Sequence, residues 1–376
     1  MIGSEMFKAD KDSLVNIFLQ LTKIDSVSFH ERKMAALLKT ELQELGFEVS
    51  EDDAAAALDG EAGNIYGILR GDPDKKPVLF SAHMDTVEPG IGKIPLLCDD
   101  GDTITSDGNT VLGADDVTGV VEILEGVRLA KDSAHGDIEV LFTMGEEAYA
   151  KGAGVFDYSR LVSEDAYVLD MSGAPGTAAR KAPSIISFEV TVTGKSAHAG
   201  FAPEEGINAL KTAANAITRI KQGHISENTT FNIGTIKAGK ATNIIADRCV
   251  CTGEARGFDH EEAMAQIDNA ETIFREEAGK TDAGVEIIRT VHIKAYETPE
   301  DADVCRCFRR ACAELGLKGE ITSTLGGSDN NVFVQHGLSG IVLSSGMYNT
   351  HTTKEYTYTK DLITGSELVA AIIKNR

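Results

Sequence analysis

Histidine and acidic side chains stand beside several separate apolar segments of this chain. Seven of them have types and positions suited to chemistry: His83, Asp85, Asp115, Glu146, Glu147, Asp170 and His351. Neutral imidazole combined with carboxylate oxygen, without thiolate, is the ligand set of a catalytic zinc ion rather than a structural one. We therefore expect this chain to carry out metal-assisted hydrolysis.

The apolar segments explain how residues so far apart in the sequence could meet. His83 directly follows the apolar run 78–82, Asp170 follows the run 167–169, and Glu146 lies just past a third run. In an open parallel sheet, ligands bind outside the carboxyl ends of the strands. If these runs are parallel strands, they deliver their side chains to one edge of the sheet.

Each of these residues, taken singly, has a structural alternative. A histidine at a strand end is commonly a half-buried structural residue, and Asp115 with Asp116 could serve as a helix N-cap and a charge that favours the helix dipole. Glu146 and Glu147 could be solvated loop residues. Their gathering at one edge favours a metal site, because crowded carboxylates raise one another's pKa unless a cation lies between them.

The order of the predicted elements indicates two domains. Strand-like runs alternate with helical periodicity in the first part of the chain and again toward its end, which is typical of a mostly parallel α/β sheet. The composition changes near Gly173–Ala182, and from Ser184 the order is the β-α-β-β-α-β of a ferredoxin-like unit. We predict an α/β catalytic domain of residues 1–178 and 296–376, interrupted by an inserted α+β ferredoxin-like domain of residues 179–295.

Charge and composition limit the partners and the location. The 376 residues carry a formal net charge of −23, which argues against nucleic acid and anionic membrane partners, because both attract clusters of Lys and Arg. No stretch approaches the roughly 20 apolar residues that span a bilayer, and the polar N-terminal segment lacks the apolar run of a secretory signal. The six cysteines lack zinc-binding spacing and are expected to be reduced thiols. The sequence thus predicts a cytoplasmic protein.

The motifs around these residues resemble those of the co-catalytic zinc peptidases of the aminoacylase–carboxypeptidase type, and most closely the peptidase T branch. The resemblance runs in order along nearly the whole chain. The stretches that carry it are His83-Met84-Asp85-Thr86-Val87, Gly113-Ala114-Asp115-Asp116, Gly145-Glu146-Glu147, Ser196-Ala197-His198-Ala199-Gly200, Thr242-Asn243-Ile244-Ile245, Glu254-Ala255-Arg256, Gly326-Gly327-Ser328-Asp329-Asn330 and His351-Thr352.

The resemblance implies two divalent metal ions. Zinc is expected, and manganese or cobalt would accept the same ligands. The implied metal ligands are His83, Asp115, Glu147, Asp170 and His351, with Asp115 bridging both ions. His83 and Asp170 would complete the ligands of one ion, and Glu147 and His351 those of the other.

The resemblance also implies roles in catalysis. Asp85 would orient His83, and Glu146 would be the general base that takes a proton from a metal-activated water and passes it to the leaving amine. A cis peptide would join Asp115 to Asp116.

In this family the inserted domain is a lid that also forms the dimer. The resemblance implies that His198 reaches into the partner subunit's active site and stabilises the oxyanion. Asn243 and Arg256 would hold the carboxylate or backbone of the substrate. Gly327 and Ser328 would line the substrate cleft, although the same two residues could form only a glycine turn and a helix N-cap.

Together these features predict a dinuclear metal-dependent exopeptidase that hydrolyses an amide bond of small peptides, as a tripeptide or dipeptide aminopeptidase. One alternative is an N-acyl amino acid deacylase or a carboxypeptidase that uses the same machinery. A more remote alternative is a non-catalytic binding protein, and the complete set of ligands together with Glu146 argues against it. The expected partners are a small peptide substrate and a second copy of the chain, which would form a homodimer.

Overall fold

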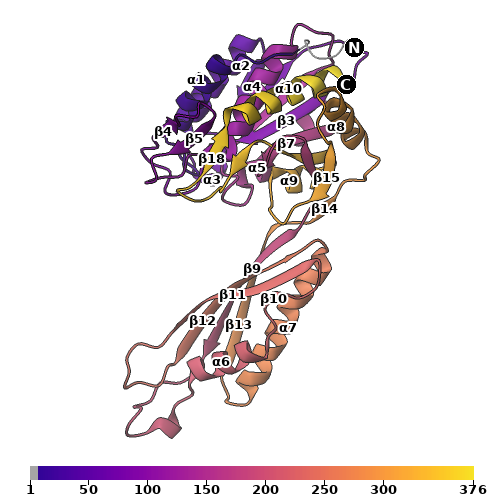
Figure 1. Ribbon diagram of the computed structural model, residues 1–376. Helices are drawn as coiled ribbons and strands as arrows, with labels where there is room; N and C mark the ends of the chain where they lie inside the picture. Colours follow the sequence, from indigo (N-terminus) through magenta and orange to yellow (C-terminus); the bar gives the residue numbers. More distant parts are fainter. Residues whose placement is uncertain (1–6) are drawn as a thin grey trace. The chain divides into compact units, whose positions relative to one another are not determined.

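The computed structural model describes residues 7–376, which form two compact units (Figure 1). Unit 1 contains the chain through Lys181 together with residues 297–324 and 328–376. Unit 2 contains residues 182–296 and 325–327 and is therefore inserted into unit 1 along the sequence. Across the described range, every helix is too short or too polar to cross a lipid bilayer.

Within the described residues, a nine-stranded sheet forms the centre of unit 1. Its strands, in spatial order, are β1 (Glu48–Glu51), β2 (Ile65–Leu69), β6 (Ile138–Thr143), β3 (Val78–His83), β7 (Asp165–Met171), β16 (Ser339–Ser344), β8 (Thr177–Ala182) and β14 (Tyr296–Glu297), with β15 (Glu320–Ser323) paired to β8. β3 runs parallel to both β6 and β7, and β16 runs parallel to β7. β3 and β6 are buried along their whole length, which explains their continuous apolar character.

Helices cover this central sheet. They are α1 (Lys11–Thr22), α2 (Arg32–Leu45), α3 (Ala54–Leu58), α4 (Ala114–Ala130), α5 (Lys151–Val155), the 3₁₀ helix η1 (Tyr158–Arg160), α8 (Asp303–Glu314), α9 (Asp329–Gln335) and α10 (Thr359–Lys374). α4 packs against β3 and β7, and α10 packs against α4. The two helices approach closely at Gly126, where a Cβ atom would lie 2.5 Å from the side chain of Val369. α4 is thereby held with its N-terminus beside the end of β3.

A second, smaller sheet belongs to unit 1. Its strands, in spatial order, are β17 (Met347–Tyr348), β18 (Tyr356–Tyr358), β5 (Thr103–Ser106) and β4 (Pro95–Leu97). β17 and β18 are antiparallel, and the loop between them carries His351. This loop follows closely after β16, so the last predicted ligand also stands near the end of a strand of the central sheet.

Unit 2 is an antiparallel sheet with two helices. In spatial order the strands are β10 (Gly223–His224), β11 (Thr229–Ala238), β12 (Arg248–Gly257), β9 (Ser184–Thr193) and β13 (Gly284–Ile293), and the helices are α6 (Ala209–Arg219) and α7 (His260–Gly279), with the 3₁₀ helix η2 (Pro203–Glu205) before α6. Alternate residues of β9 are buried, and they pack with the apolar faces of α6 and α7 into a separate core. The order of the long elements is the predicted β-α-β-β-α-β.

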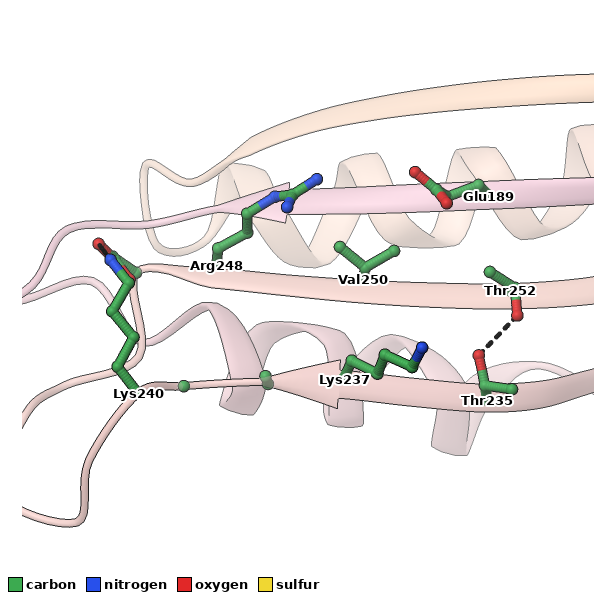
Figure 2. A pocket seen from close by; sticks show the side chains of 10 residues that line it. Glu189, Thr235, Lys237, Lys240, Arg248, Val250 and Thr252 are labelled. Atoms are coloured by element: carbon green, nitrogen blue, oxygen red, sulfur yellow. Dashed lines mark hydrogen bonds and ion pairs between the residues drawn. The ribbon is translucent and has the colours of Figure 1, made fainter.

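The face of the unit 2 sheet that is turned away from its helices is open. Figure 2 shows a cavity on this face, with the side chains in front of the strands and the helices behind them. The cavity has a volume of about 530 Å³ and is lined by charged and hydroxyl residues, including Lys237, Arg248 and Glu189. Thr235 and Thr252 bridge β11 and β12 there through a 2.6 Å hydrogen bond. None of the residues singled out in the sequence lines this cavity.

Candidate active site

Three neighbouring strands bring the first predicted side chains to one edge of the central sheet. His83 is the last residue of β3, Asp170 is the next-to-last residue of β7, and Glu146 and Glu147 follow shortly after β6. Because β3 is parallel to β6 and to β7, the carboxyl ends of all three strands meet at the same edge.

The two carboxylate oxygens of Asp115 face different histidines. Oδ1 lies 3.0 Å from Nε2 of His83, and Oδ2 lies 3.2 Å from Nε2 of His351. Asp115 stands at the start of α4, where Gly113 has the positive φ of 81° and the backbone angles of Asp115 and Asp116 are not helical. The peptide between these two aspartates is cis. The helix start therefore turns the Asp115 side chain to a position between the two imidazoles.

Each histidine also meets a second carboxylate. Nε2 of His83 lies 3.9 Å from Oδ1 of Asp170, and Nε2 of His351 lies 2.9 Å from Oε1 of Glu147. Two compact groups of potential ligand atoms include His83. One contains Asp116 and Asp170, and the other contains Asp115 and Glu147. Asp116 rather than Asp115 thus accompanies Asp170. Asp115 is the carboxylate that contacts both histidines, as a ligand shared by two ions would have to do.

The distances within these clusters suit a metal ion. Ligand atoms lie about 2.0–2.2 Å from a four-coordinate zinc, which places them roughly 3.3–3.6 Å from one another in a tetrahedral arrangement. The four nitrogen–oxygen distances in the clusters range from 2.9 to 3.9 Å. The donor set, imidazole nitrogen with carboxylate oxygen, also matches catalytic zinc and related divalent ions.

Burial and mutual repulsion raise the pKa values of acidic groups in the site. Burial raises the pKa of Glu146 well above its ordinary value, and the charge of Asp170 raises it further. Burial likewise raises the pKa of Asp170 well above its ordinary value, and Asp115 adds to this although His83 opposes it. Within residues 7–376, no lysine or arginine forms an ion pair with these carboxylates. Divalent cations would relieve this repulsion, so the residues present fit a metal centre.

The histidines reflect the same concentration of negative charge. Hydrogen bonds with Asp115 and Glu147 raise the pKa of His351 to about 11. Burial disfavours the charged form of His83, but hydrogen bonds with Asp115 and Asp85 outweigh it and raise the pKa of His83 well above its ordinary value. Both shifts favour the protonated imidazole, whereas histidine binds metals in its neutral form, so protons and a metal ion would compete for these two rings.

Asp85 is fully buried and holds the loop that carries the predicted base. Its carboxylate accepts hydrogen bonds from the backbone N–H groups of Glu146 and Glu147, at 2.9 and 3.1 Å, and from the hydroxyl of Ser28 at 2.6 Å. Nδ1 of His83 lies 2.9 Å from the backbone oxygen of Asp85 and 3.4 Å from its carboxylate. Asp85 therefore contacts His83 mainly through its backbone and directs its side chain to the Glu146 loop.

Three buried acidic residues that support the site were missed in the sequence. Glu31 accepts the backbone N–H of Gly145 at 3.0 Å, directly before Glu146. Glu355 accepts the N–H groups of Gly113 and Asp115, at 2.7 and 2.9 Å. Asp329, at the start of α9, accepts a hydrogen bond from the hydroxyl of Thr143, and its charge raises the pKa of Glu146.

These three carboxyl groups share one property that the sequence does not reveal, which is burial. Burial raises the pKa of Glu31 and of Glu355 to about 7 and that of Asp329 to about 6. The only sequence signals are weak ones: Glu355 follows four residues after His351, and Asp329 lies within the Gly326–Asn330 motif.

The remaining predicted residues are separate in sequence from the predicted metal ligands. His198 and Ile244 form an isolated β-bridge, and the N–H of Ala199 donates to the backbone oxygen of Asn243 at 3.0 Å, so unit 2 brings His198 and Asn243 together. Arg256 is engaged within unit 2, because its Nε donates to Glu254 at 2.6 Å and its Nη1 donates to the backbone oxygen of Leu325 at 3.1 Å.

The glycine-rich motif is divided between the two units. Gly327 belongs to unit 2, where a Cβ atom on it would lie 2.0 Å from Ile293. Ser328 belongs to unit 1 and caps α9, in a capping box with Asn331. Helix capping explains Ser328, and its contact with substrate stays a prediction, as does that of Gly327.

Comparisons with known proteins show which proteins this chain resembles. A model of the peptidase dimerisation domain matches residues 181–282, and a model of peptidase family M28 matches residues 64–202. The crystal structure of aminopeptidase PepT from Bacillus cereus is similar over 98% of this chain and 99% of that chain, with 34% identity and a TM-score of 0.91. A tripeptidase from Staphylococcus aureus has 33% identity and a TM-score of 0.94 over 98% of both chains. The uncharacterized protein YqjE of Bacillus subtilis is 34% identical over 96% of this chain and 97% of its own length.

Proposed function

Because the chain belongs to the peptidase T group of metallopeptidases and is a metal-dependent hydrolase of small peptides, we propose that it removes the N-terminal residue from tripeptides or dipeptides. The observation that carries this proposal is the position of Asp115 between His83 and His351, in a chain that matches an aminopeptidase and a tripeptidase over nearly its full length.

We propose that two divalent ions bind at the clusters around Asp115. His83 and Asp170 would hold one, and Glu147 and His351 would hold the other, with Asp115 shared. Bound there, such ions would polarise the scissile carbonyl group and lower the pKa of water. Zinc is the expected metal, and manganese or cobalt would suit the same ligands.

Glu146 is the proposed general base. It stands next to a proposed ligand, on a loop whose N–H groups are fixed by Asp85. Burial and the charge of Asp170 raise the pKa of its carboxyl group, which makes its carboxylate a stronger base. A base with such a pKa can accept a proton from water and later release it to the leaving amine.

Substrate positioning is assigned to the inserted lid, for which we propose residues 179–295 between catalytic segments 1–178 and 296–376. His198 would stabilise the oxyanion in the active site of a partner subunit, and Asn243 and Arg256 would hold the substrate. Arg256 is paired with Glu254, and the remaining N–H groups on Nη1 and Nη2 of its guanidinium would be the ones that bind a substrate carboxylate. The match of a dimerisation domain to residues 181–282 supports a homodimer.

We also propose that the enzyme works in the cytoplasm. None of the six cysteines, all of which lie within residues 7–376, forms a disulfide. Reduced thiols are typical of proteins in that compartment.

Two measurements test the proposed function. Free tripeptides and their N-acetylated forms should be compared as substrates, and cleavage confined to the acetylated forms would indicate the deacylase alternative. Glu146→Ala should keep both metal ions but lose turnover by about 10²–10⁴-fold, the usual contribution of a general base. A near-normal rate in a metal-loaded Glu146→Ala protein would remove Glu146 from the mechanism.

A further inference from the structure

The segment after His198 folds back onto the imidazole ring. The N–H groups of Gly200 and Phe201 both donate to Nδ1 of His198, at 3.1 and 3.3 Å, and the N–H of Phe201 is shared with the backbone oxygen of His198, also at 3.3 Å. The backbone oxygen of His198 also accepts the N–H of Ala202 at 3.0 Å, which closes the turn. The imidazole is therefore fixed by its own loop on the Nδ1 side.

This geometry determines which ring nitrogen can carry the proton. A backbone N–H can only donate, so Nδ1 must present its lone pair to Gly200 and Phe201. In the neutral imidazole the proton then resides on Nε2. Nε2 donates no hydrogen bond to the described part of unit 2 and is left as a free N–H donor.

The ring of Phe201 supplies a second constraint. It packs against the imidazole with the ring centroids 4.3 Å apart and the planes tilted by 30°. Phe201 is otherwise 86% exposed, so it contributes little to the core of unit 2. An exposed aromatic ring whose main neighbour is a histidine is placed to orient that histidine rather than to stabilise the fold.

We propose that the turn at residues 198–202 is a device that fixes the neutral ring of His198 in its Nε2–H tautomer, and that Phe201 is a positioning residue for it. The inference rests on the proposed role of His198 at the oxyanion. It adds the protonation form in which His198 works and the residues that impose that form. A donor whose tautomer and plane are set in advance needs no reorganisation when negative charge develops on the substrate.

The tautomer can be measured without substrate. In full-length protein labelled with ¹⁵N-histidine, the neutral form of His198 should show an unprotonated Nδ1 and a protonated Nε2, and loss of these signals in His198→Gln would assign them. Gly200→Pro removes one of the two donors to Nδ1 and should shift His198 toward a mixture of tautomers. A proton on Nδ1, or an equal mixture in the parent protein, would overturn the inference.

Kinetics test the part played by Phe201. Phe201→Ala should lower kcat by about 2- to 10-fold, the rate equivalent of one ring pair at an exposed site, with little change in KM or in Tm. Phe201→Tyr keeps the ring and should restore kcat. Unchanged kcat in Phe201→Ala, or a loss that Phe201→Tyr does not restore, would remove Phe201 from this role.

These results separate the inference from the proposed function. If His198→Gln keeps full peptidase activity, the oxyanion role of His198 fails, whatever the tautomer. If His198→Gln loses activity while the ¹⁵N signals place the proton on Nδ1, the proposed function stands and the positioning turn is refuted.

Discussion

Replacement of Glu355 by glutamine should weaken metal binding although Glu355 is not itself a ligand. Its two oxygens accept the N–H groups of Gly113 and of Asp115, which is the proposed bridging ligand. Glutamine keeps one acceptor and turns an amide N–H₂ toward the other N–H. One hydrogen bond to a charged group is lost, at about 1.5–3 kcal/mol, and a buried donor is left without a partner.

The free energy lost in Glu355→Gln should appear partly as lower folding stability and partly as weaker metal binding. Changing groups that support metal ligands typically weakens metal binding by about 10- to 100-fold, which corresponds to about 1.4–2.7 kcal/mol. Both ions should be affected, because Asp115 is placed to contact both. The affinity should be measured by competition with a coloured chelator at pH 8, where the Glu355 carboxyl of the parent protein, with its pKa of about 7, is mostly ionised.

Glu139 provides a matched control. It is also buried in unit 1 and accepts backbone N–H groups, from Val162 at 3.0 Å and from Ser163 at 2.6 Å, but it lies near the opposite end of β6 from the site. Glu139→Gln should reduce Tm without changing the metal affinity. Equal metal affinities of the folded Glu355→Gln and parent proteins would refute the reasoning.

Other changes have defined outcomes. In the folded protein Glu31 holds its proton up to about pH 7, whereas in the unfolded chain it does so only to about pH 4.5. The stability contributed by this group therefore falls as the pH rises through that window. Glu31→Gln should raise the Tm of the metal-free protein at pH 8 by an amount equivalent to at most about 3 kcal/mol, and an equal gain at pH 4 would contradict this. Chelation should abolish activity and lower the Tm, and zinc should restore both; activity that survives complete metal removal would exclude the metal mechanism. Mixed dimers of His198→Ala and Glu146→Ala should regain part of the activity, and confirmed mixed dimers without any gain would count against a shared site.

The convergence of the proposed metal ligands could be predicted because it depends on local signals. His83 and Asp170 each stand at the end of a short apolar run, and the rule for parallel strands places such ends at one edge. The packing of one face of the unit 2 sheet against helices could also be predicted, because β9 alternates between buried and more exposed residues. Both inferences need only the neighbours of each residue in the sequence.

Features that depend on remote partners could not be predicted in this way. The segment 173–182 was interpreted only as a change in composition, yet Thr177–Ala182 forms β8, paired with β16 and β15 in the central sheet. Its sequence lacks a clear alternation of apolar residues. Glu31 and Glu355 resemble ordinary surface charges, because the backbone N–H groups that they bind come from distant parts of the chain.

The two histidines of the site differ greatly in their contact with solvent. The side chain of His83 is 1% exposed, whereas that of His351 is 53% exposed and lies on the loop between β17 and β18. An ion held through His351 would therefore be open to the medium on one side, whereas an ion held through His83 would be enclosed by protein. Removal of metal by a chelator should then begin at the His351 side of the site.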